Sequence, residues 1–147
     1  MPHEEFPTGS LRTFFERFQS LNAVSDEGIA EMYAGHVMIA GRNGTQVVGS
    51  ADLLRAVPKR KQLLASVGYQ DTSLVGFLET ALTERYALVR AQFRWLFHPA
   101  NSEPATVTLP STFVVDRGGD SPHIVLYMNE QDVVSVLRER GMLPPVS

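Results

Sequence analysis

The stretch RYALVRAQFRWLF, residues 85–97, decides the fold of this chain. Alternate residues divide it into two different faces, as in a β-strand whose side chains point to opposite faces of a sheet. One face is wholly apolar, which is typical of a sheet face that covers a core or a cavity. It carries Ala87, Val89, Ala91, Phe93, Trp95 and Phe97, and the mixed face carries Tyr86, Leu88, Arg90, Gln92 and Arg94.

The mixed face has two interpretations. Large side chains and arginines without a single acidic residue are typical of a subunit interface. The alternative is an exposed sheet face on which arginine stems lie flat. We favour the interface, because most soluble oligomers are homo-oligomers. The sequence therefore predicts a homodimer that forms through Leu88, Arg90, Gln92 and Arg94.

The segments around this strand predict an α+β protein. Further strands are expected at 36–41, 70–82, 105–116 and 123–129, with a turn at Asn43-Gly44. Helices are expected from Ser10, over 25–35, from Ser50 and over 130–141. Pro58 lies inside the third helical pattern, so we expect a kink or break near Val57. Pro58 is followed by Lys59, Arg60 and Lys61, which we interpret as a solvated helix face.

Length and composition restrict the possible classes of protein. A chain of 147 residues fits one domain over 1–147, in which we expect residues 1–9 to be a flexible extension. The net charge of −3 argues against a nucleic-acid partner, and no apolar stretch is long enough to span a membrane. The N-terminus lacks a signal-peptide pattern, so a cytoplasmic location is expected.

Several kinds of site have no counterpart in the sequence. Cysteine is absent, which excludes thiol nucleophiles and disulfides. The histidines have no metal-ligand spacing, and no Gly-x-Ser-x-Gly motif occurs. The pair Gly118-Gly119 lies in a predicted hairpin turn rather than before a helix, which argues against a phosphate loop. We therefore expect neither a metal nor a cofactor.

The segments at 33–36 (YAGH) and 49–53 (GSADL), in this order of elements, resemble the nuclear transport factor 2-like superfamily. This superfamily includes the SnoaL-like cyclases and the ketosteroid isomerases, and the resemblance covers residues 10–129. It implies a cone-shaped barrel: a curved antiparallel sheet wrapped around N-terminal helices, with a short C-terminal helix and a pocket at the open end. It also implies that the outer sheet face can form a dimer. The chain resembles uncharacterised bacterial members.

The functional residues of steroid isomerases are not retained at the matching positions. The general-base aspartate falls at Gly41, the oxyanion-binding tyrosine at Arg17 and the protonated aspartate near Ser111. Enolisation needs one group that takes a proton and others that hold the developing negative oxygen. The resemblance therefore implies the fold without this chemistry.

Strand alternation and the resemblance together predict a mainly apolar pocket that binds a small hydrophobic molecule. The alternative is that the same residues fill a solid core. The predicted ligand-binding residues are Val37, Ile39, Phe93, Trp95, Ser111, Phe113, Tyr127 and Asn129.

Three hypotheses for the function remain open. The first is a small-molecule-binding protein without catalysis. The second is an enzyme of the cyclase, isomerase or dehydratase kind, for which Tyr127 and His36 are the catalytic candidates. The third is a non-catalytic dimeric interaction module. If Ile39 and Gly41 point into the cone, alternation places His36 on the opposite face.

Overall fold

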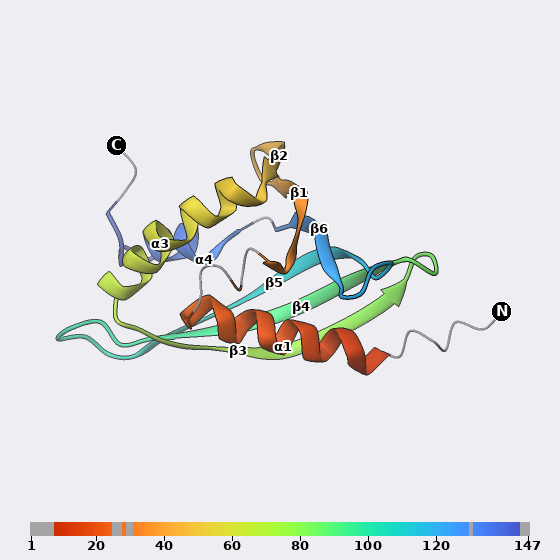
Figure 1. Cartoon of the computed structure of the whole chain (residues 1–147). Helices are drawn as coiled ribbons and strands as arrows, with labels where there is room; N and C mark the ends of the chain where they lie inside the picture. Colours follow the sequence, from red (N-terminus) through yellow and green to blue (C-terminus); the bar gives the residue numbers. More distant parts are fainter. Residues whose placement is uncertain (1–7, 25–27, 29–30, 130, 145–147) are drawn as a thin grey trace.

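The computed structural model describes residues 8–24, 28, 31–129 and 131–144. An open sheet carries helices on its concave face (Figure 1). The helices are α1 (Thr8–Val24), α3 (Ser50–Ser66) and α4 (Val133–Glu139). The strands are β1 (Tyr33–Gly41), β2 (Gly44–Gly49), β3 (Tyr69–Ala81), β4 (Tyr86–Phe97), β5 (Ala105–Asp116) and β6 (His123–Met128).

The six strands form one sheet in the order β2-β1-β6-β5-β4-β3. Neighbouring strands are antiparallel, except for β1 and β6, which are parallel. The sheet is therefore mixed, with β2 and β3 as its two edges. The α+β class and the curved sheet with N-terminal helices and a short C-terminal helix are confirmed, while the sheet stays open instead of closing into a barrel.

The apolar face of β4 lies in the core, as its alternation predicts. All six apolar residues of this face, from Ala87 to Phe97, are at most 7% exposed. Helix α1 packs on this face through Leu11, Phe15 and Phe18, which follow helical spacing. The ring of Phe15 lies 4.6 Å from that of Phe113 on β5, so α1 closes one end of the concave face.

The strand boundaries agree with the expected ranges within two residues from β3 onward, whereas the first half of the chain differs more. Strand β1 begins at Tyr33 rather than at His36, so the preceding helix does not reach Gly35. Of the helix expected over 25–35, residues 28 and 31 are helical, residues 33–35 belong to β1, and residues 25–27 and 29–30 lie outside the described residues. Strand β2 was not predicted, because its sequence GTQVVG is short and follows the turn directly. The turn itself is confirmed, and Gly44 has φ 117°, which favours glycine.

The expected start of the first helix is shifted, and the break expected near Val57 is wrong. Helix α1 begins at Thr8, and residues 1–7 of the expected extension lie outside the described residues. Helix α3 runs through Pro58 without interruption, although the proline removes one N–H donor. Leu64 and Val57 of α3 belong to the core or pack against it, so tertiary packing outweighs the lost hydrogen bond.

Within the described residues, no helix combines the length and the apolar character needed to cross a membrane.

Candidate functional site

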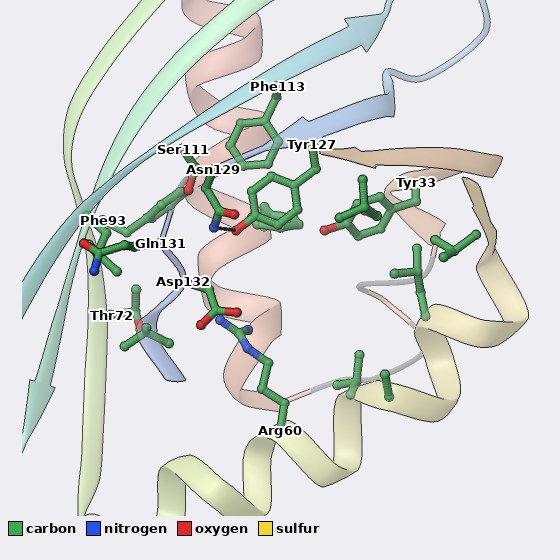
Figure 2. A pocket seen from close by; sticks show the side chains of 18 of the residues that line it. Tyr33, Arg60, Thr72, Phe93, Ser111, Phe113, Tyr127, Asn129, Gln131 and Asp132 are labelled. Atoms are coloured by element: carbon green, nitrogen blue, oxygen red, sulfur yellow. Dashed lines mark hydrogen bonds between the residues drawn. The ribbon is translucent and has the colours of Figure 1, made fainter. Parts of the chain in front are cut away.

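A cavity of about 360 Å³ lies between the concave face of the sheet and helix α3. Its volume is within the range of small-molecule pockets, and most of its lining is apolar. Figure 2 shows that side chains reach it from the sheet, from α3 and from the segment that leads into α4.

Seven of the eight residues predicted to bind a ligand line this cavity. They are Ile39, Phe93, Trp95, Ser111, Phe113, Tyr127 and Asn129. The eighth, Val37, is fully buried and does not belong to the lining. Its side chain is part of the packed protein interior, so it supports the wall rather than facing the cavity.

The two catalytic candidates lie apart. Tyr127 lines the cavity, whereas His36 does not. The side chain of His36 is exposed, on the face of β1 opposite to Val37 and Ile39, because successive strand residues point in opposite directions. The structure therefore brings only Tyr127 to the site.

Tyr127 is held in a defined orientation. Its ring stacks on that of Phe113 at 5.0 Å, with an angle of 10° between the planes. The side-chain amide of Asn129 donates a hydrogen bond of 2.9 Å to the phenol oxygen (Figure 2). Because this oxygen is the acceptor, its own proton is left to donate to another group.

A second phenol, that of Tyr33, points into the same cavity (Figure 2). No hydrogen bond joins its hydroxyl to another described residue. Burial raises the pKa of Tyr33, and the nearby Tyr127 raises it further, while Arg60 opposes the shift. The phenol is therefore protonated at neutral pH and is a hydrogen-bond donor.

Three charged side chains also line the cavity. Arg60 of α3 lies with its guanidinium carbon 5.2 Å from the centre of the Trp95 ring. Asp132 caps α4, because its Oδ1 accepts a hydrogen bond of 2.8 Å from the backbone N–H of Ser135. Asp52 lies on the exposed side of α3, where it forms an ion pair with Arg55.

The structure shows where the three positions that match the catalytic residues of steroid isomerases lie. Gly41 lies at the end of β1, and a Cβ atom there would lie 3.7 Å from the carbonyl oxygen of Asn129. Arg17 is exposed on α1, and Ser111 is buried on the cavity wall. No carboxylate occupies these three positions, so the isomerase arrangement is absent from this cavity.

The residues predicted to form a dimer interface lie on the other side of the sheet. Arg90, Gln92 and Arg94 are exposed, and Leu88 is half-buried. None of them lines the cavity. Within the part of the chain that the structure describes, no three histidine, aspartate or glutamate side chains gather to hold a metal ion.

Sequence reasoning missed seven polar residues of the lining: Tyr33, Gln46, Asp52, Arg60, Thr72, Gln131 and Asp132. Tyr33 falls inside the helix that the sequence predicts over 25–35. Arg60 was interpreted as part of a solvated face, yet it follows Leu53 and Val57 at helical spacing and precedes Leu64, so it lies on the apolar stripe of α3. A cation on such a stripe is the signal that could have identified it.

Comparison of the sequence with protein-family models and with curated proteins finds no match. Solved structures, in contrast, resemble it closely in fold. Aln2 from a Streptomyces species has a TM-score of 0.72 at 13% identity, covering 95% of this chain and 99% of Aln2. An NTF2-like protein with a cystatin-like fold from Novosphingobium aromaticivorans has a TM-score of 0.70 at 14% identity, covering 93% and 88%.

A third similar structure is the beta subunit of the benzoate 1,2-dioxygenase from Burkholderia mallei. Its TM-score is 0.67 at 14% identity, and the match covers 88% of this chain and 97% of the subunit. Because such different proteins share one architecture, the structural similarity indicates the fold and does not indicate an activity. The chain has the nuclear transport factor 2-like fold.

Proposed function

We propose that this protein binds a small, mainly apolar molecule in the cavity between α3 and the concave face of the sheet. The observation that carries the proposal is the cavity of about 360 Å³ with its apolar walls and converging polar groups. Apolar walls contribute affinity, and a few polar groups orient the ligand. Phe93, Trp95 and Phe113 supply large apolar surfaces on one side, and Leu53 and Val57 supply the other.

The polar groups favour a ligand that carries a carbonyl or hydroxyl oxygen. The phenols of Tyr33 and Tyr127 both lie on the lining, and the proton of Tyr127 is left for a further acceptor by its bond from Asn129. Both tyrosines are half-buried and can donate into the cavity, so a ligand oxygen between these phenols would be recognised. The apolar surroundings would strengthen such a hydrogen bond.

Fluorescence titration with the apolar probe N-phenyl-1-naphthylamine tests the proposal. We expect one saturable site per chain and quenching of Trp95, the single tryptophan of the chain. Ser111→Leu adds apolar bulk inside the cavity and should weaken binding at least tenfold. Thr112→Leu adds the same side chain to the neighbouring residue, which points to the other sheet face, and should leave the affinity within twofold.

Two results would overturn the proposal. One is the absence of saturable probe binding by the wild-type protein. The other is equal binding by Ser111→Leu and Thr112→Leu, because a probe inside the cavity must respond to the first substitution and not to the second.

A proton-transfer enzyme is the second candidate, and Asp132 is the observation in its favour. Its carboxylate lines the same cavity as the phenol of Tyr127 (Figure 2). One oxygen of Asp132 holds the Ser135 N–H, and the carboxylate remains a potential base. A carboxylate base beside phenol donors is an arrangement that isomerases and dehydratases use.

The ring opening of 5-nitrobenzisoxazole tests this candidate, because a carboxylate in an apolar cavity accelerates this proton abstraction. We expect the wild-type protein to exceed the buffer rate and Asp132→Asn to lose the acceleration. Asparagine still caps a helix, so this variant keeps α4. Asp52→Asn removes the other carboxylate of the lining and serves as the control. Equal rates for Asp132→Asn and the wild type would exclude Asp132 as the base.

A further inference from the structure

A second cavity, of about 250 Å³, adjoins the first one where α3 ends and β3 begins. It is lined by Val57, Arg60, Lys61, Leu64, Ala65, Tyr69 and Trp95. Three of these residues, Val57, Arg60 and Trp95, also line the main cavity. The two cavities therefore meet at the contact between the Arg60 guanidinium and the Trp95 ring.

The second cavity is apolar except for cations and one phenol. Arg60 and Lys61 contribute the charges, and no acidic side chain belongs to its lining. The hydroxyl of Tyr69 is already engaged, because it lies 2.6 Å from Oγ1 of Thr72. A ligand group in this space would therefore meet the Arg60 guanidinium beside apolar walls.

Arg60 is available to bind an anion. Among the residues that the structure describes, no carboxylate forms an ion pair with it. Its contact with Trp95 is a cation–π interaction, in which the guanidinium lies near the ring and forms no hydrogen bond. Its N–H groups can therefore still donate to an acceptor. Figure 2 shows the guanidinium directed into the main cavity, on the side of Asp132.

Neither acidic residue of the main cavity forms an ion pair with Arg60. Asp132 caps α4 through Ser135, and Asp52 pairs with Arg55 on the surface of α3. The guanidinium therefore lies at the boundary of both cavities, with the Asp132 carboxylate on the side of the main cavity (Figure 2) and no carboxylate in the lining of the second one.

We propose that the two cavities together form one elongated site for a small organic acid. Its apolar body occupies the main cavity, and its anionic group lies at Arg60, at the boundary with the second cavity. A guanidinium binds a planar anion through parallel hydrogen bonds, and apolar walls strengthen this contact. This inference rests on the proposed function and adds the charge of the ligand to it.

A pair of probes that differ by one charged group tests the inference. 8-Anilinonaphthalene-1-sulfonate carries a sulfonate on the same rings as the neutral N-phenyl-1-naphthylamine. Dissociation constants of both probes are measured by fluorescence for the wild type, Arg60→Met, Arg60→Lys and Lys59→Met. Lys59 is the exposed neighbour of Arg60, and it lines neither cavity, so it controls for general surface charge.

We expect Arg60→Met to lower the affinity for the sulfonate probe about tenfold, because a hydrogen bond to a charged group is lost. The neutral probe should change less than twofold, because methionine keeps the apolar stem on Trp95. Arg60→Lys keeps the charge and should retain most of the affinity for the sulfonate. Lys59→Met should leave both probes unchanged.

Three results would overturn the inference. The first is an equal loss of affinity for both probes in Arg60→Met. The second is a loss of affinity for the sulfonate probe in Lys59→Met that equals the loss in Arg60→Met. The third is a wild type that binds the neutral probe more tightly than the sulfonate probe. In each case binding of the neutral probe still supports the proposed function. If the wild type binds neither probe, the proposed function fails, and the inference fails with it.

Discussion

The side-chain amide of Asn129 donates a hydrogen bond of 2.9 Å to the phenol oxygen of Tyr127. Tyr127 lies in β6 and Asn129 directly after it, and both face the main cavity (Figure 2). Since the amide fixes the phenol oxygen as an acceptor, the phenol proton is directed to a third group. In the proposed complex that third group is an oxygen of the ligand.

Tyr127→Phe should weaken binding of an oxygen-bearing probe selectively. We expect the affinity for 1-acetonaphthone to fall about fivefold, because one neutral hydrogen bond is lost. N-phenyl-1-naphthylamine, which lacks a carbonyl oxygen, should bind within twofold of the wild type. Competition between the two probes measures both affinities. An equal effect on both would mean that the phenol contributes its ring and not its proton.

Gly68→Ala should destabilise the fold at the turn between α3 and β3. Gly68 has φ 76°, and an added Cβ atom would clash with the carbonyl oxygen of His98. Left-handed backbone and this clash together should lower the free energy of unfolding by more than about 1 kcal/mol. Gly35→Ala is the control, because a Cβ atom there meets no atom within 4 Å. Urea denaturation compares the variants, and equal midpoints would contradict this account of the turn.

Glu79→Gln should gain stability relative to the wild type as the pH rises from 4 to 7. Glu79 and Arg117 form an ion pair of 3.3 Å with side chains that are 4% and 5% exposed. Burial raises the pKa of Glu79, and Arg117 opposes this shift. The folded state therefore binds the proton more tightly than the unfolded state. The stability that this group contributes is full below its ordinary pKa and is lost as the pH rises through the raised value.

Chemical denaturation of both proteins at several pH values measures this difference. A difference that stays constant between pH 4 and 7 would contradict the raised pKa. Arg117→Met provides the contrast, because it leaves the buried carboxylate without its guanidinium. Its cost should be about 3–5 kcal/mol near neutral pH, as for other broken buried ion pairs.

The outer face of the sheet remains the predicted dimer interface. The strand register aligns Leu78, Arg90, Thr112 and Met128 in one row across it, and Leu78 is 62% exposed. Light scattering at micromolar concentration should give a dimer. Leu78→Glu should make it monomeric, because a carboxylate would enter the apolar contact. Leu82→Glu changes an equally apolar residue, 53% exposed, in the turn after β3, and should leave the dimer intact. A monomeric wild type would refute the interface.

Alternation was sufficient to predict the part of the site that the long strands build. The inward residues of β4, β5 and β6 follow from period two, and the structure places Phe93, Ser111 and Tyr127 together on the cavity wall. Leu109 belongs to the same alternation on β5 and could have been added. Strands of this length have one register with a buried face, so the sequence determines their orientation.

The short elements could not be predicted in this way. Tyr33 lies where a helix gives way to a strand, and local propensity does not locate that boundary. Arg60 was assigned to the solvent because cations beside it are solvated, and only the packing of α3 against the sheet places it over Trp95. Asp132 is the N-cap of α4, so its local role is readable, but its presence in the cavity depends on how the chain folds back after β6.

A crystal structure of the protein with N-phenyl-1-naphthylamine tests the central claim most directly. The account predicts density for the probe between α3 and the sheet, against Phe93 and Phe113 and within reach of the Tyr127 phenol. The contradicting result is a closed interior, in which Leu53 and Val57 of α3 pack onto Phe93 and the probe is absent from the cavity.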